Sequence, residues 1–190
     1  MTEEITYPDV IIPYGASFTS PIDKVWACIQ DYAGWGKWYS VLEDMHIIGD
    51  GIDKIGAVRV VNSKASGMRY EEALLVKDPV EHRVDYGIIS ITPPFPFMKN
   101  QVLSVRLVSK GENETELIGQ ATLTPNCEMS AEALDKFRGQ VVGAYQKVYG
   151  ALEDYLNSQK EQPTFPDVPI PYEASFTSPI EKVWPLLADF

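Results

Sequence analysis

Residues 7–32, YPDVIIPYGASFTSPIDKVWACIQDY, contain the two elements with which the fold begins. Over residues 11–19 apolar side chains alternate with small or polar ones, which is the period of a half-buried strand. A helix start follows at once, because Ser20 can cap, Pro21 suits the first helical position and Asp23 places an acid in the first turn. This segment therefore predicts a strand that leads directly into a helix over residues 21–30.

The same segment returns near the end of the printed sequence. Residues 165–190, FPDVPIPYEASFTSPIEKVWPLLADF, match residues 7–32 without a gap at 17 of 26 positions. Because a match of this length does not arise by chance, we expect tandem copies of one domain. The first copy would span residues 1–158, a linker residues 159–164, and the truncated opening of a second copy residues 165–190. We also expect residues 165–190 to pair with a sheet edge or to exchange between molecules, which would give a homo-oligomer or domain swap.

Composition limits the classes of function. The chain has 190 residues, of which 45% are hydrophobic and 23% charged, as in ordinary globular domains. Its net charge of −11 repels phosphate backbones and anionic lipid surfaces, so nucleic acid is not an expected partner. Two isolated cysteines, Cys28 and Cys127, predict no disulfide framework and favour a reducing, cytoplasmic setting. No signal peptide or membrane span is expected from the hydropathy pattern.

The rest of the chain predicts an α+β protein. Residues 31–38 contain two glycines and indicate a turn or second short helix. Six strands are then expected, at residues 43–49, 56–63, 68–77, 82–90, 98–109 and 114–124. Their short connections favour antiparallel pairing. From residue 130 to 158 apolar side chains recur every three or four positions, which predicts a helix roughly 40 Å long.

Several short stretches, taken in order, resemble a known superfamily. They are Ala16-Ser17-Phe18 before Pro21, Lys24-Val25-Trp26, Asp31-Tyr32, Gly34-Trp35, Lys37-Trp38, Gly56-Ala57-Val58-Arg59, Glu72, Leu74, Asp78, Asp85-Tyr86 and Pro93-Pro94-Phe95-Pro96. With the expected order of elements, they resemble the START-like, or SRPBCC, superfamily over residues 10–157. This group includes polyketide cyclase/dehydrase-type proteins and the birch-pollen-allergen-like proteins.

The resemblance implies a helix-grip fold. In that fold a seven-stranded, strongly bent antiparallel sheet wraps around a long C-terminal helix, with two short helices after the first strand. It also implies an internal cavity for a small hydrophobic or amphipathic ligand, such as a lipid, a polyketide or an isoprenoid-like molecule, and no cofactor. The alternative function is a cofactor-independent enzyme of the cyclase, dehydratase or aldol type, acting on a polyketide-like or aromatic substrate. A third interpretation treats the copies as an interaction array whose interiors are filled by side chains.

The residues expected to line such a cavity are mostly large and apolar. They are Trp38, Met45, Arg59, Tyr86, Ile88, Phe97, Gln120, Phe137, Val141 and Tyr145. Related proteins often carry a tryptophan in the last strand, where this chain has residues 118–120, IGQ, so we expect a larger or differently polar cavity there. Gly139 and Gly143 lie one helical turn apart, and either leave volume for a ligand or allow close backbone packing.

Arg59 has two possible roles, which separate the functions. It either holds the acidic or carbonyl end of a ligand or pairs with Glu72 or Glu71. The catalytic candidates are Glu72, Tyr86 and His46, with Arg59 as oxyanion partner. A buried carboxyl without a cation would favour an enzyme, and a satisfied ion pair would favour a binding protein.

The remaining ionisable residues are expected to be structural or exposed. Asp85 and Lys99 alternate with apolar neighbours and are expected on the solvated surface. His46 and His82 lack the spacing of metal ligands, so no metal site is predicted.

Overall fold

The structure is a computed structural model that describes residues 6–49, 51, 54–64 and 66–160. The expectations for residues 161–190, including pairing or exchange of the second copy, lie outside the described residues.

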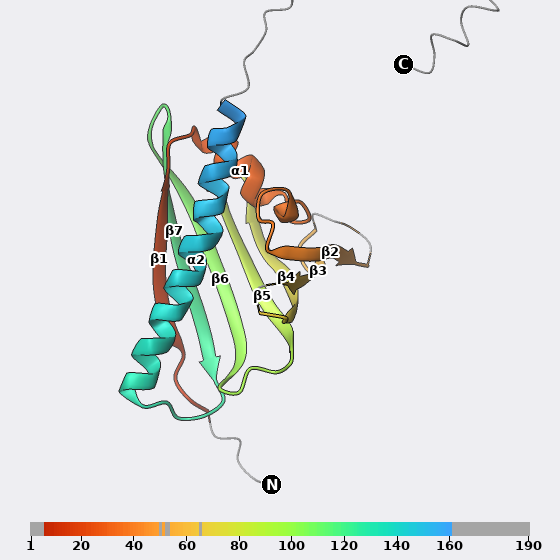
Figure 1. Ribbon diagram of the computed structural model, residues 1–190, viewed down its shortest axis with the longest axis vertical. Coiled ribbons are helices and arrows are strands. Elements are labelled where there is room, and N and C mark those ends of the chain that lie inside the picture. The colour runs from red at the N-terminus through yellow and green to blue at the C-terminus, as the bar shows by residue number, and fades with distance from the viewer. Residues whose placement is uncertain (1–5, 50, 52–53, 65, 161–190) are drawn as a thin grey trace, which may run out of the picture.

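A seven-stranded antiparallel sheet and a long C-terminal helix make up the domain (Figure 1). The sheet order is β1-β7-β6-β5-β4-β3-β2. The strands are β1 (Val10–Phe18), β2 (Leu42–Ile48), β3 (Val58–Ser63), β4 (Arg69–Asp78), β5 (Arg83–Thr92), β6 (Met98–Gly111) and β7 (Glu114–Pro125). The helices are α1 (Ile22–Gln30), the 3-10 helix η1 (Trp35–Lys37) and α2 (Ala131–Lys160). The α+β helix-grip prediction is confirmed, including the two short helices after the first strand.

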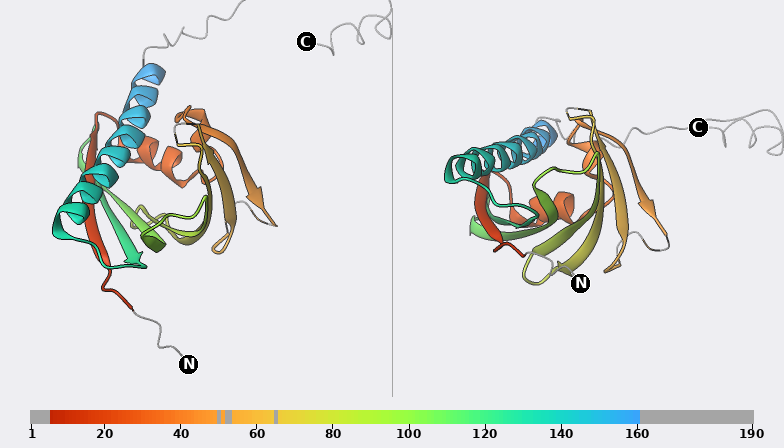
Figure 2. Two further views of the ribbon diagram at one scale, coloured as in Figure 1. Left: turned by 60° about the horizontal axis from the view of Figure 1, so that its bottom comes forward. Right: turned by 90° about the horizontal axis from the view of Figure 1, so that it is seen from below.

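The sheet is strongly bent, and α2 packs against one margin of it. Viewed from below, the strands curve around the interior while α2 lies beside β1 at one margin (Figure 2). Strands β3, β4 and β5 stand on the far side of that interior. This arrangement positions the cavity described below between α2 and the distant strands.

The first strand and helix pack as the alternating pattern predicts. Ile12, Tyr14 and Phe18 are buried on one side of β1, and Val25 and Ile29 of α1 are fully buried beneath the helix.

The predicted cap of α1 is wrong. Pro21 occupies the N-cap position without a side-chain hydrogen bond, and the Ser20 hydroxyl is buried without a partner in the described part of the chain. The Ser20 carbonyl instead accepts a hydrogen bond from the Thr115 hydroxyl at 2.8 Å. Ser20 thus links the start of α1 to β7 through its backbone carbonyl. Pro21, with its fixed φ, stands immediately before the first helical residue.

Helix α2 is capped at one end and fastened at the other. The Ser130 hydroxyl accepts a hydrogen bond from the Ala133 amide at 3.2 Å. Near the other end, the Thr19 hydroxyl donates to Glu153 at 2.5 Å, and the Lys160 ammonium donates to the Thr19 carbonyl. These contacts hold the C-terminal half of α2 against the end of β1, and the N-terminal half is left to cover the cavity.

Tyr14 occupies the space next to the glycine of the last strand. A Cβ added to Gly119 would lie 2.0 Å from a Tyr14 ring carbon, and the Tyr14 ring is stacked on Tyr145 with centroids 4.2 Å apart. Where the sequence predicts a larger or differently polar cavity at residues 118–120, the Tyr14 ring of β1 fills the space beside Gly119.

None of the helices in the described part of the chain combines the length and the apolar character that a membrane crossing requires.

Candidate functional site

A cavity of about 750 Å³ lies between α2 and the strands opposite it. It is lined mainly by apolar side chains from η1, β3, β4, β5, β6 and α2. Representative lining residues are Trp35, Val61, Tyr70, Ile88, Leu103, Phe137, Val141 and Val148. A hollow of this size is typical of small-molecule sites and contradicts an interior filled by side chains.

Six of the ten predicted lining residues face this cavity. They are Arg59, Tyr86, Ile88, Phe137, Val141 and Tyr145. They lie on β3, β5 and α2, the elements that the bent sheet brings face to face.

The other four predicted residues do not line the cavity. Trp38 is buried beside Trp35, with ring centroids 5.0 Å apart, and it is Trp35 that forms the wall. Met45 is half-buried on β2 and packs against the core cluster. Phe97 is not among the lining residues, and its ring packs edge-to-face on that of Phe137, with the ring centroids 4.9 Å apart.

Gln120 faces the other way. It is exposed on β7, and its amide donates to the Thr122 hydroxyl on the same face at 3.1 Å. The reason is register, because the inward positions of β7 are the odd-numbered residues Leu117, Gly119, Ala121 and Leu123.

The two glycines of α2 differ in position. Gly143 lines the cavity, whereas Gly139 is exposed. An added Cβ would meet no atom within 4 Å at either position, so close backbone packing explains neither glycine.

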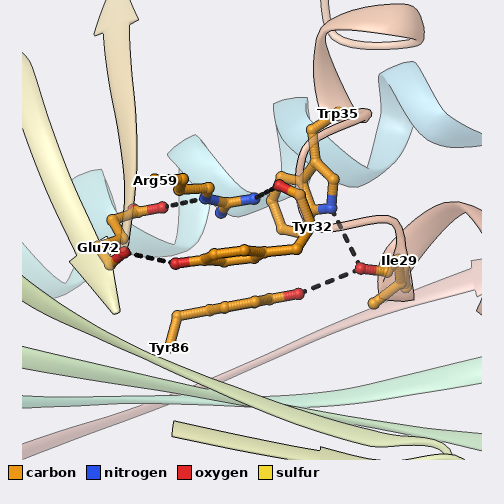
Figure 3. Close-up of polar contacts among 6 residues, drawn as sticks. All are labelled: Ile29, Tyr32, Trp35, Arg59, Glu72 and Tyr86. Atoms are coloured by element: carbon orange, nitrogen blue, oxygen red, sulfur yellow. Dashed lines mark hydrogen bonds and ion pairs between the residues drawn. The ribbon is translucent and has the colours of Figure 1, made fainter. Parts of the chain in front are cut away.

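Arg59 and Glu72 form a buried ion pair in the cavity wall (Figure 3). Arg59 is 2% exposed, and its Nε donates to Oε2 of Glu72 at 2.6 Å. Its Nη1 donates to the Tyr32 carbonyl at 3.0 Å. The residues are direct neighbours on β3 and β4, so sheet register brings the two charges together.

Three aromatic rings enclose the Arg59 guanidinium (Figure 3). Its central carbon lies 4.3 Å from the Trp35 ring centroid, 4.5 Å from that of Tyr32 and 4.9 Å from that of Tyr86. Trp35 and Tyr86 each donate a hydrogen bond to the Ile29 carbonyl at 3.2 Å, which fixes both rings against the end of α1. Cation–π attraction thus adds to the ion pair, in a site to which η1, β3, β4 and β5 contribute side chains.

The ion pair leaves this wall without net charge. Burial lowers the pKa of Arg59, whereas the Glu72 carboxylate and nearby tyrosines raise it, and the net direction is upward. Arg59 is therefore a permanent cation balanced by Glu72. Of the two roles considered for Arg59, pairing with Glu72 is the one the structure shows.

The chain matches the protein family described as "Polyketide cyclase / dehydrase and lipid transport" over residues 16–157. It belongs to this family. The match begins near the end of β1 and covers β2 to β7 and almost all of α2, so it includes all the residues that line the cavity.

Solved structures share the fold at low sequence identity. Ara h 8.0201 is 14% identical, with a TM-score of 0.65 over 80% of this chain and 99% of that one. Norcoclaurine synthase from Thalictrum flavum, solved with dopamine and hydroxybenzaldehyde, is 11% identical, with a TM-score of 0.64 over 83% and 91%. A START superfamily protein from Mycobacterium smegmatis is 12% identical, with a TM-score of 0.61 over 78% and 98%. A search of curated proteins finds no match to the chain.

The other ionisable candidates lie outside the cavity of this family member. His46 is exposed on β2, with Nδ1 2.8 Å from the Asp44 carbonyl. Lys99 is exposed, as expected. Asp85 is not: it is buried and forms an ion pair with Arg83 at 2.6 Å. Within the described residues, no group of three or more possible ligands could hold a metal ion.

Sequence reasoning missed many of the residues that line the cavity, among them Trp35, Gln101 and Tyr149. A signal existed for Gln101, because it takes the inward position in the alternation of Gln101, Leu103, Val105 and Leu107 on β6. A polar residue in such a series is a candidate for a polar contact inside the cavity.

Five tyrosines around the cavity predict alkaline unfolding. Burial is the largest cause that raises the pKa of Tyr14, Tyr32, Tyr86, Tyr145 and Tyr149 above the ordinary value of 10.0. The unfolded chain loses these protons first, so their contribution to stability is complete below pH 10 and falls as the pH rises above it. As the pH is raised above 10, we expect the tyrosinate absorbance of these buried residues to increase over the same pH range in which the near-ultraviolet circular dichroism signal is lost. Ionisation of all tyrosines near pH 10 in the folded protein would contradict this.

Proposed function

We propose that this protein binds a small apolar or amphipathic molecule inside the cavity between α2 and the bent sheet. The observation that carries the proposal is an apolar hollow of about 750 Å³ in which the buried ion pair of Arg59 and Glu72 is satisfied within the wall. Membership of a family that includes lipid transport supports it.

Catalysis of a cyclase, dehydratase or aldol type has less support from the geometry. Glu72 is engaged with Arg59, and the Tyr86 hydroxyl donates to the Ile29 carbonyl. His46 is exposed and outside the cavity. The three candidates therefore do not assemble a free base next to a free acid, which is what such chemistry needs.

The proposal predicts that filling the cavity blocks ligand uptake. N-Phenyl-1-naphthylamine is a neutral dye whose fluorescence rises in apolar surroundings. We expect the protein to bind it saturably, and Val141→Trp to weaken binding by about tenfold or more, because the new ring occupies ligand volume.

The matched control is Gln146→Trp, which places the same side chain on an exposed position of the same helix. Fluorescence titration measures both variants, and circular dichroism verifies that they are folded. The absence of saturable binding to the unmodified protein would overturn the proposed function.

We also propose a cytoplasmic location. It is supported by two cysteines, Cys28 and Cys127, that are both free. Fractionation of the native cells with an antibody to the protein tests this, and recovery in an exported fraction would contradict it.

A further inference from the structure

A second polar pair joins β6 to α2 in the lining of the cavity. Gln101 projects from β6 and is 8% exposed, and Tyr145 projects from α2. The Gln101 amide nitrogen donates to the Tyr145 hydroxyl oxygen at 2.9 Å, and both residues line the cavity. The pair is electrically neutral.

This pair has hydrogen-bonding capacity left over. The Tyr145 hydroxyl accepts from Gln101, but its own proton has no acceptor among the described residues. The Gln101 side-chain oxygen likewise has no donor in the described part of the chain. The Tyr145 hydroxyl proton and the second N–H of the Gln101 amide are therefore donors, and the Gln101 oxygen is an acceptor, for a ligand in the cavity. A buried polar group without a partner is costly.

The charge balance of the cavity selects against an anionic ligand. Arg59 is neutralised by Glu72 at 2.6 Å and enclosed by three aromatic rings. Lys147 also lines the cavity, but its side chain is exposed and, two positions from Tyr145 on α2, it does not face the Tyr145 side chain. A carboxylate held at Tyr145 would therefore not be paired by Lys147 and would be a negative charge in apolar surroundings, which is strongly unfavourable. A neutral hydroxyl group avoids this cost, and it both donates and accepts, as the pair requires.

We propose that Gln101 and Tyr145 form a subsite for the hydroxyl group of a neutral, apolar ligand, that is, an alcohol or phenol with a large hydrocarbon part. The inference rests on the proposed function and names the class of ligand for the same cavity. Tyr145 suits this role because its ring is fixed by stacking on Tyr14. Its hydroxyl is therefore held in place before a ligand binds.

The test measures displacement of N-phenyl-1-naphthylamine by three probes of one chain length: 1-decanol, decyl methyl ether and decanoate. We expect decanol to displace the dye most effectively, since the ether lacks the hydroxyl proton and decanoate is charged. This comparison uses the unmodified protein. In Tyr145→Phe and Gln101→Met, decanol affinity is expected to fall by about three- to tenfold more than dye affinity does, because the dye does not depend on a hydroxyl contact.

Two control variants make the same chemical changes outside the cavity. They are Gln120→Met, at an exposed position of β7, and Tyr155→Phe, at a position of α2 that is not among the lining residues. Both are expected to bind decanol as the unmodified protein does.

The two proposals fail in different ways. Saturable dye binding with decanoate preferred over decanol, or with decanol affinity unchanged in both cavity variants, would overturn the hydroxyl subsite and leave the binding function standing. No saturable dye binding in the unmodified protein would overturn both.

Discussion

Glu72→Gln is expected to lower the free energy of unfolding by about 3–5 kcal/mol. The substitution keeps the shape of the side chain and removes its charge. Arg59 then remains as a buried cation, 2% exposed, which contacts neutral acceptors such as the Tyr32 carbonyl and three ring faces instead of a carboxylate. Removing one partner of a buried pair costs more than the pair contributes, because the other charge loses its compensation.

The adjacent residue on the same strand is the matched control. Glu71 pairs with Arg69 at 2.7 Å, but their side chains are 29% and 46% exposed. Because water screens an exposed pair, Glu71→Gln is expected to cost no more than about 1 kcal/mol. Urea denaturation followed by circular dichroism gives both values. Equal costs for the two variants would show that Arg59 does not become a costly uncompensated charge when Glu72 is neutralised.

A double variant separates the cost of an unpaired charge from the cost of altered packing. Arg59→Met/Glu72→Leu removes both charges, and we expect it to be more stable than Glu72→Gln. A double variant less stable than the single one would instead assign the effect to packing of the guanidinium between the rings.

Gly119→Ala is expected to lower the free energy of unfolding by about 1–3 kcal/mol, although alanine is only one methyl group larger. The added Cβ would lie 2.0, 2.4 and 2.5 Å from three carbons of the Tyr14 ring. That ring cannot withdraw, because it is 8% exposed and stacked on Tyr145. Either β1, which carries Tyr14, or α2, which carries Tyr145, therefore has to shift, and this disturbs the packing between the two elements.

A double-mutant cycle with Tyr14→Ala checks this cause. Once the ring is absent, Gly119→Ala is expected to cost almost nothing, so the coupling energy should equal most of the single effect. Gly111→Ala serves as a control on β6, where an added Cβ would be 3.9 Å from the nearest atom. A cost for Gly119→Ala that persists without Tyr14 would assign the effect to the strand backbone.

The order of elements could be predicted from local patterns because each pattern reports its own segment. Alternation in residues 11–19 became β1, and the three- and four-residue spacing after residue 130 became α2. Ser20 shows the limit of this approach. Its type suits a helix cap, yet tertiary contact with Thr115 uses its backbone instead.

Which side a residue faces was harder to predict than which element contains it. Gln120 and Gln101 are both glutamines in neighbouring strands, and only Gln101 is inward. One residue of register reverses the direction of every side chain in a strand. Trp35, at the start of η1, and Trp38, just after it, show the same difficulty: the two rings are three residues apart, and only Trp35 lines the cavity.

The sequence by itself determined the element types, the antiparallel order, the long final helix and the acidic, apolar-rich composition, because these depend on periodicity and residue type over short segments. Only the tertiary structure decided that Arg59 is neutralised by Glu72, that Tyr14 takes the place beside Gly119, and that Gln101 meets Tyr145. Each of these joins residues from different elements. Their contact depends on the register of the strands and on where the bent sheet places α2, which no single segment encodes.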